Sequence, residues 1–222
     1  MRDDDKPRAA LFDMDRTLIR CDTASLYVRY QRDVREATTR QGLRVAWWLM
    51  QYTLGVIDAE GVAERALADF RGREERWMAH ACRDWYRRYV RPHIAEAGRR
   101  AVARHRARGD FVAIVTGATR YAAEPLAEEL GIDHVVCTRL DVSSAGRFTG
   151  RIEKPMCYGP GKITLARAIA ERHGAKLEDA TFYSDSITDL PLLEAVAKPV
   201  VVNPDARLAR LARARRWPIE RW

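Results

Sequence analysis

The sequence predicts an α/β fold, a doubly wound parallel sheet core with a helical cap inserted after the first strand. Apolar strand segments alternate with amphipathic helical segments from residue 111 onward, the pattern of parallel strands joined by helical crossovers. Between the first strand segment and Pro92 the pattern is instead helical throughout, over about seventy residues. We therefore expect residues 1–20 and 92–222 to form the core and residues 21–91 to form the cap.

Turn and stop signals place the individual elements. The segment "RAALFDMD" after Pro7 contains an apolar run, as expected of a buried strand of a parallel sheet. Pro92 ends the helical block, and Gly109 separates a basic helix at about 94–107 from the strand "FVAIVT". The other expected elements are a helix at 118–131, a strand at 134–138, a hairpin around 143–146, a helix at 162–174, a strand at 180–185, a helix at 189–197, a strand at 199–202 and a last basic helix.

The composition is that of a folded globular protein. The chain has 222 residues, of which 47% are hydrophobic, and this is enough for a large core. The net charge of +8 comes from 39 basic residues interspersed with 31 acidic ones, so we interpret the basic clusters as solvated helix faces and expect no nucleic-acid partner.

The N-terminus is charged and no apolar run reaches the roughly 20 residues of a membrane span, which favours a cytoplasmic location. No CxxC pair or metal-ligand spacing occurs, so we expect reduced thiols at Cys21, Cys82, Cys137 and Cys157.

The most apolar segment, residues 45–57, allows more than one interpretation. Apolar side chains surround the predicted helix, and Trp47 and Trp48 lie within it. Burial in the core of the cap is the expected arrangement. A homodimer contact, or a peripheral membrane contact through the Trp47–Trp48 region, is the alternative.

Acidic residues follow two of the expected strands. The strand segment "RAALFDMD" ends in Asp13, Met14 and Asp15, while "ATFYSD" ends in Asp185, with Asp189 four residues later. Ligands of open parallel sheets bind at the carboxyl ends of the strands, so we expect these side chains to meet at one edge of the sheet. Carboxylates gathered in this way need a hard cation between them, and oxygen ligands suit Mg²⁺.

A hydroxyl group and an ammonium group are expected at the same edge. Thr116 and Gly117 end the strand "FVAIVT", and Lys162 opens the helix that follows "CYGPG". These groups add donors for an anion. Together with the carboxylates they predict a site for a phosphoryl group and its metal, with an aspartate free to attack.

These motifs, in this order, resemble the haloacid dehalogenase superfamily of phosphotransferases. "DMDRT" is similar to the first motif of that family, DxDxT, which includes Thr17; "VTG" is similar to the second motif; Lys162 resembles the third; and "SDSITD" resembles the fourth, DxxxD. The cap lies between the first and second motifs, and the phrases "FTGRI", "SDSITDLPLLEAV" and "VVNPD" look closest to subgroup IB of the phosphoserine phosphatase-like branch. The resemblance covers nearly the whole chain and implies a Rossmann-like core with a helical cap of the C1 type.

The resemblance also implies a role for each site residue. Asp13 would attack phosphorus and form an aspartyl-phosphate, Asp15 would protonate the leaving alcohol and then activate water, and Lys162 would neutralise charge. The remaining implied roles are phosphoryl binding by Thr116 and the Gly117 N–H, Mg²⁺ binding by Asp13, the Asp15 carbonyl and Asp185, and support by Thr17 and Asp189. Asp22 stands where phosphoserine phosphatases carry a glutamate that contacts the substrate amine, so it is the candidate for substrate contact.

The predicted function is therefore Mg²⁺-dependent hydrolysis of a phosphomonoester. A small phosphorylated metabolite such as phosphoserine is the expected substrate, and histidinol phosphate and a lysophospholipid are alternatives. Two departures put phosphoserine itself in question as the substrate. Arg16 stands where many relatives have Gly or Ser, and Ser184, Ser186 and Thr188 stand where phosphoserine phosphatases tend to have Gly, Gly and Asn. A non-catalytic basic module that binds nucleic acid or membrane is the alternative of a different class.

Overall fold

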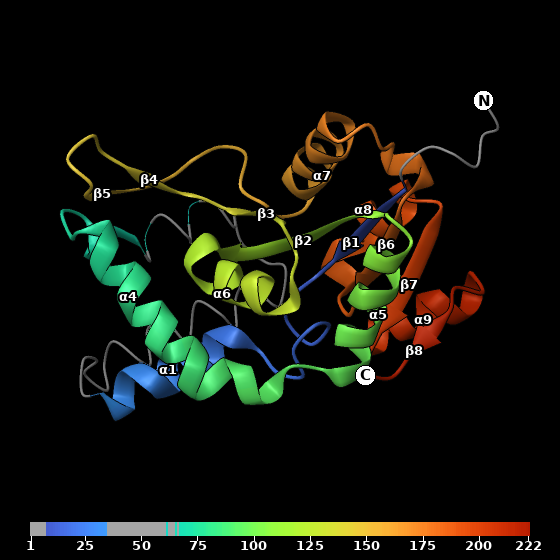
Figure 1. The fold of residues 1–222 in the computed structure, drawn as a ribbon, viewed down its shortest axis with the longest axis horizontal. Helices are drawn as coiled ribbons and strands as arrows, with labels where there is room; N and C mark the ends of the chain where they lie inside the picture. The colour runs from blue at the N-terminus through green and yellow to red at the C-terminus, as the bar shows by residue number, and fades with distance from the viewer. Residues whose placement is uncertain (1–7, 35–60, 62–64, 66) are drawn as a thin grey trace.

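A computed structural model describes residues 8–34, 61, 65 and 67–222 of the chain (Figure 1). The apolar segment 45–57, with Trp47 and Trp48, lies outside these residues, so its burial, dimer contact or membrane contact stays a prediction. In the part of the chain that is described, no helix combines the length and the apolar character that a membrane span requires.

The described residues contain a parallel sheet with the strand order β3-β2-β1-β6-β7-β8. The chain builds outward from β1 in one direction through β2 and β3, and then in the other direction from β6, so the sheet is doubly wound as the sequence predicts. The strands are β1 (Ala9–Phe12), β2 (Phe111–Thr119), β3 (His134–Thr138), β6 (Thr181–Ser184), β7 (Lys198–Val202) and β8 (Ile219–Glu220).

The central strand β1 is buried on both faces. Ala10 and Phe12 belong to the hydrophobic cluster on one face of the sheet, while Ala9 and Leu11 belong to the cluster on the other face. This follows from the period of two along a strand, and it explains why all four residues must be apolar. Helices α5 (Glu96–Ala107) and α6 (Arg120–Leu130) cover the first face, whereas α7 (Pro160–Arg172), α8 (Leu190–Ala195) and α9 (Ala206–Ala214) cover the second.

Two elements next to the predicted site extend beyond the sequence prediction, and one short strand was not predicted. Strand β2 continues three residues past Thr116, because it resumes pairing with β3 after a bulge. Helix α7 begins at Pro160, two residues before Lys162, since proline is well suited to the first turn of a helix. Strand β8 was not predicted from the sequence, because two residues after Pro218 carry no periodicity and only their pairing with β7 defines them.

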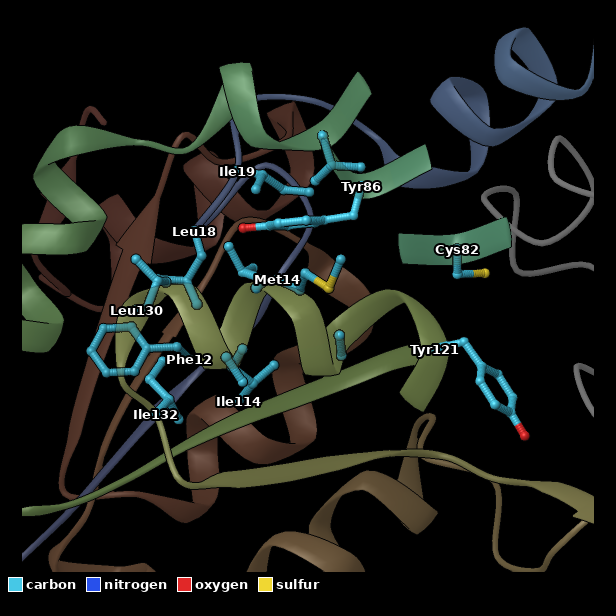
Figure 2. Packing of buried hydrophobic residues seen from close by; sticks show 14 of the residues in the cluster. Phe12, Met14, Leu18, Ile19, Cys82, Tyr86, Ile114, Tyr121, Leu130 and Ile132 are labelled. Carbon is cyan, nitrogen blue, oxygen red and sulfur yellow. The ribbon is translucent and has the colours of Figure 1, made fainter. Parts of the chain in front are cut away.

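Helices dominate the described part of the predicted cap segment, residues 21–91. Helix α1 (Thr23–Asp33) is followed, after a 3₁₀ turn, by α4 (Glu75–Trp85), and a π-helix (Tyr86–Val90) continues α4. Figure 2 shows Tyr86 among residues Met14, Leu18 and Ile19 of the core, and all four are buried.

Between the two helices, the segment 72–75 runs beside a hairpin of β4 (Leu140–Val142) and β5 (Phe148–Ile152). The Gly72 N–H donates to the Phe148 carbonyl over 2.8 Å, and the Glu75 N–H donates to the Gly146 carbonyl over 2.9 Å. The hairpin therefore anchors the segment to the rest of the chain, and the exact division into core and cap stays a prediction.

Candidate active site

Two predicted site residues lie at the point where the strand order changes direction. Asp13 follows β1 directly, and Asp185 follows the neighbouring strand β6. The Asp13 N–H donates to the Tyr183 carbonyl over 2.9 Å, which ties the end of one strand to the other. Both carboxylates are buried, and they occupy the position where ligands bind in open α/β sheets.

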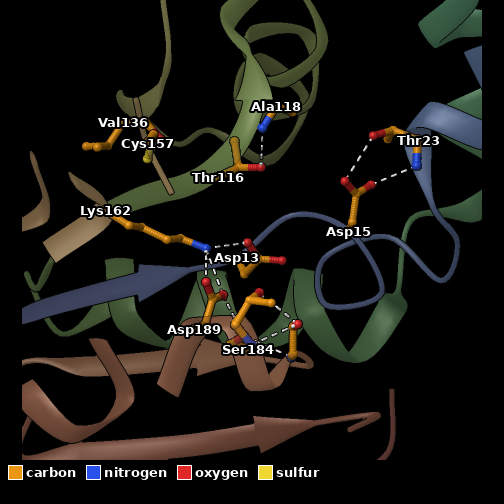
Figure 3. Close-up of polar contacts among 12 residues, drawn as sticks. Asp13, Asp15, Thr23, Thr116, Ala118, Val136, Cys157, Lys162, Ser184 and Asp189 are labelled. Carbon is orange, nitrogen blue, oxygen red and sulfur yellow. Dashed lines mark hydrogen bonds and ion pairs between the residues drawn. The ribbon is translucent and has the colours of Figure 1, made fainter. Parts of the chain in front are cut away.

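Lys162 links Asp13 to Asp189 (Figure 3). Its Nζ donates to Asp13 Oδ1 over 2.8 Å and to the two carboxylate oxygens of Asp189 over 2.8 and 2.7 Å. Ser184 adds a hydrogen bond of 2.7 Å from its Oγ to Asp189 Oδ2. The lysine is only 4% exposed, so these contacts are made in a largely water-free environment. One oxygen of Asp13 receives no bond from Lys162 and is available for chemistry.

The site carries more negative than positive charge. Burial raises the pKa of Asp13 to about 7, although the Lys162 ammonium opposes the shift, and burial with the Asp13 charge raises the pKa of Asp185 to about 8. Burial alone would lower the pKa of Lys162, but Asp13 and Asp189 hold it above its usual range. Three buried carboxylates thus face a single buried ammonium, which is the situation that a bound cation relieves.

The donor atoms fit Mg²⁺. Among the described residues no group of three or more His, Cys, Asp or Glu side chains is arranged to hold a metal ion. The predicted set needs only two such side chains, Asp13 and Asp185, because its third ligand is the main-chain carbonyl of Asp15. All of these donors are oxygen atoms, and the uncompensated charge at the site is negative; both properties suit a hard divalent cation.

The Asp15 carboxylate points away from Lys162, toward the start of α1 (Figure 3). The Thr23 N–H donates to Asp15 Oδ1 over 2.8 Å, and the Thr23 hydroxyl donates to Oδ2 over 3.0 Å. Burial raises the pKa of Asp15 to about 6, although the bonds from Thr23 oppose the shift. A carboxyl group with a pKa close to neutral can both give and take a proton at physiological pH.

Sequence reasoning missed Thr23, although its position had a signal. Asp22 is the N-cap of α1, and its Oδ1 accepts from the Ser25 N–H over 2.9 Å. An Asp followed three residues later by Ser before an apolar run marks a helix start, and a helix start directs backbone N–H groups toward acids. The substrate contact expected of Asp22 stays a prediction.

The end of β2 exposes donors at the same edge. Thr116 is buried, and its Oγ accepts from the Ala118 N–H over 3.2 Å, so the hydroxyl proton is left to donate elsewhere. The pairing of β2 with β3 skips Gly117 and Ala118, so the backbone of these two residues bulges out of the sheet. Thr17 is fully buried, and its hydroxyl has no hydrogen-bond partner among the described residues. The roles expected of these residues stay predictions.

The loop after β7 holds the loops that follow β1 and β6. Its sequence, "VVNPD", served above only as a mark of the subgroup, and sequence reasoning gave no role to its residues. Asn203 Nδ2 donates to the Arg16 carbonyl over 3.0 Å, and Arg16 has a left-handed backbone with φ of 53°. Such a conformation is strained for a residue with a side chain and persists only where neighbours hold it. Asp205 Oδ2 accepts from the Ile187 N–H over 2.8 Å, and the Asp205 N–H donates to the Asp185 carbonyl over 3.0 Å. The rule that ligands bind at strand ends applies to β7 as well, and it could have identified this loop.

A family comparison covers all of the loops just described except the one after β7. The model of the haloacid dehalogenase-like hydrolases matches residues 10–194 of the chain. The chain belongs to the haloacid dehalogenase-like hydrolases. This confirms the family that the motifs resemble, and it confirms the expectation of a phosphatase-type enzyme at the level of the family.

Curated relatives of this hydrolase match over nearly its whole length. A histidinol-phosphatase of Neisseria meningitidis serogroup C is 32% identical over 216 residues, which is 95% of this chain and 96% of the relative. The phosphoserine phosphatase SerB1 of Mycobacterium tuberculosis is 32% identical over 219 residues, which is 97% of this chain and 71% of the relative.

Solved structures agree with the fold of the hydrolase. A protein of unknown function from Bordetella pertussis Tohama I has a TM-score of 0.87 at 30% identity, and the match covers 97% of this chain and 98% of that one. A phosphoserine phosphatase with a phospho-aspartyl intermediate analogue has a TM-score of 0.68 at 20% identity, over 97% of this chain and 93% of that one. The predicted Rossmann-like fold of the superfamily is thereby confirmed.

Proposed function

We propose that this hydrolase is a Mg²⁺-dependent phosphomonoesterase that acts through an aspartyl-phosphate on Asp13. The observation that carries the proposal is the buried ammonium of Lys162, which donates to one oxygen of Asp13 and leaves the other oxygen free. This contact keeps Asp13 in one orientation at the end of β1 and supports its ionised form. An oriented carboxylate beside a fixed cation suits attack on an anionic phosphoryl group.

In the first step, the free oxygen of Asp13 forms a bond to phosphorus, and the bond from phosphorus to the ester oxygen breaks. Asp15, protonated at the start, gives its proton to the leaving alcohol; its pKa of about 6 supports this role. The Thr116 hydroxyl and the Gly117 N–H donate to the phosphoryl oxygens. Asp13, Asp185 and the Asp15 carbonyl would hold Mg²⁺, which when bound would supply positive charge for the phosphoryl oxygens.

In the second step, the ionised Asp15 takes a proton from water as the water oxygen attacks phosphorus, and Asp13 is released as a carboxylate. Thr23 keeps the Asp15 carboxylate in place in both steps, because its two donors contact both oxygens. Asp189 and Ser184 hold the Lys162 ammonium beside Asp13 throughout.

For the substrate, we propose the phosphate ester of a small amino alcohol. Histidinol phosphate and phosphoserine, the substrates named for the two relatives, both carry an ammonium group on the carbon next to the ester methylene. They differ in the third substituent, which is an imidazolylmethyl group in one and a carboxylate in the other. The carboxylate of Asp22 suits the shared ammonium group, and a lysophosphatidate lacks that group.

The experiment is a hydrolysis assay with an aryl phosphate, phosphoserine, histidinol phosphate and a lysophosphatidate. We expect activity that EDTA abolishes and added Mg²⁺ restores, with kcat/KM higher for the two amino alcohol esters. Full activity without metal would refute the role of Mg²⁺, and preference for the lysolipid would refute the substrate class. Salt-sensitive binding of nucleic acid or membrane without any turnover would support the binding-module alternative instead.

Two variants test the assignment of the acids. Asp13→Asn should fold and lose turnover, because an amide does not attack phosphorus, whereas Asp15→Asn should slow both steps and accumulate phosphoenzyme. Asp133→Asn, at an exposed position, is the matched control and should be unchanged. Retention of about a tenth of kcat by Asp13→Asn would show that the nucleophile is another residue.

A further inference from the structure

An open cavity of about 450 Å³ lies away from the active site, at the far end of α6. Helix α6 starts three residues after Gly117, and the cavity borders its last turn at Glu128 and Glu129. Eleven helical residues at about 1.5 Å each separate the two places by roughly 16 Å. The cavity is lined by Arg83, Tyr86, Arg87, Arg91, Arg99, Pro125, Glu128 and Glu129.

Arginines from two helical segments converge on this cavity. Arg83, Arg87 and Arg91 follow one another at intervals of four along the continuous helical run from α4 to the turn at Arg91–His93. Residues four apart share a face of a helix, and all three line the cavity. Arg99 of α5 also lines the cavity.

The two glutamates neutralise only part of this charge. Arg83 Nη2 donates to Glu128 over 3.1 Å, while Arg91 Nε and Arg99 Nη2 donate to Glu129 over 3.1 and 3.4 Å. Four arginines and two glutamates leave an excess of two positive charges in the lining, and Glu96, which does not line the cavity, also pairs with Arg99 over 3.7 Å.

Arg87 is the pocket arginine for which the described residues provide no partner. It is exposed, and it makes no hydrogen bond or ion pair with any residue that the structure describes. Its neighbours along the helical face, Arg83 and Arg91, are both engaged by glutamates. The unpaired guanidinium therefore lies in the middle of the row, beside two others that are held in position.

We propose that this arginine pocket binds a small dianion of the phosphate type, either inorganic phosphate or the phosphate group of a monoester. The excess of two positive charges matches the charge of about −2 that such a group carries at neutral pH. A guanidinium presents its donors as a planar fork that fits two oxygens of a phosphate. The volume lies in the range of small-molecule sites.

The pocket joins the predicted cap segment to the core. Its arginines at 83, 87 and 91 belong to the last helical run of that segment, while Arg99 and the glutamates belong to α5 and α6. Tyr86 connects the pocket to the interior, because its ring is buried and its hydroxyl donates to Glu129 over 3.0 Å. A phosphate in the pocket thus contacts both parts of the chain and adds a bridge between them.

The test is a calorimetric titration of inorganic phosphate into the wild type, Arg87→Gln, Arg87→Lys and Arg100→Gln, in EDTA and at constant ionic strength. Arg100 is the matched control, since it is exposed on α5 and does not line the pocket; its partner Glu96, which also pairs with Arg99, is kept in this variant. Phosphate bound at the active site is common to all four proteins, so differences between them report on the pocket. Hydrolysis of an aryl phosphate is measured in parallel.

We expect Arg87→Gln to lose the pocket's binding event or weaken it by about tenfold, the effect of one charge-assisted bond, while Arg100→Gln stays within about twofold of the wild type. Arg87→Lys should recover part of the affinity, and kcat should be unchanged in every variant. Identical phosphate isotherms for Arg87→Gln and Arg100→Gln would overturn the proposal. A titration of chloride into the wild type that gives the same response as phosphate would also overturn it and show an adventitious ion only. Binding that depends on Arg87 in a protein without hydrolytic activity would refute the proposed function and leave the pocket standing.

Discussion

Replacing Lys162 by methionine tests the charge arrangement of the active site most directly. The substitution keeps most of the side chain's length and apolar stem but removes the ammonium, which leaves Asp13 and Asp189 without their shared donor. Removing one partner of a buried ion pair destabilises a protein by about 3–5 kcal/mol. In a domain of this size each kcal/mol lowers Tm by about 2–4 °C, so we expect a loss of roughly 6–20 °C.

The loss should also depend on pH. The pKa of Asp13 already lies at about 7, above the ordinary value of 3.8, and removal of Lys162 raises it further. Between pH 3.8 and the raised pKa of Asp13, the folded state binds more protons than the unfolded state, so the free energy of unfolding falls as pH rises. This window extends to higher pH in Lys162→Met. The difference in Tm between wild type and Lys162→Met is therefore expected to be larger at about pH 8 than at about pH 5.

Thermal unfolding of both proteins in EDTA at these two pH values measures the effect. Lys176→Met is the matched control, because Lys176 is exposed, and its Tm should follow the wild type. A Tm for Lys162→Met within about 2 °C of the wild type, or a loss of the same size at both pH values, would show that the carboxylates do not depend on this lysine.

Three further predictions concern residues that support the site. Asn203→Ala removes the donor that holds the strained backbone of Arg16, so kcat on an aryl phosphate should fall about fivefold while KM changes little. An unchanged kcat in steady-state kinetics, together with a lower Tm, would contradict this prediction. Thr23→Val removes one bond that lowers the pKa of Asp15, so the alkaline limb of the kcat/KM profile should move to higher pH, and an unmoved limb would count against Asp15 as the acid. Burial lowers the pKa of His105, so the unfolded state takes up a proton first as pH falls below about 6.5, and the stability of the wild type declines. His105→Gln should therefore show a shallower decline of Tm between about pH 7 and pH 5, and equal declines in the two proteins would contradict this.

The sequence by itself determined the fold class and the edge of the sheet where the acids gather. Asp13 and Asp185 each follow an apolar run with strand character, and the alternation of strands and helices makes those strands parallel. Parallel strands have their carboxyl ends at the same edge, so the acids had to meet there. This inference needs only local patterns and their order along the chain, and both can be read from the sequence.

Only the tertiary structure decided which groups contact one another. Lys162 and Asp13 are 149 residues apart, and Asn203 and Arg16 are 187 residues apart, so no local pattern relates them. The arginine pocket likewise depends on the packing of α4, α5 and α6, because this packing decides which arginines Glu128 and Glu129 reach and leaves Arg87 without a partner among the described residues. Hydrogen bonds and pKa shifts depend on distances of a few ångströms and on burial by several elements at once, and a sequence pattern specifies neither.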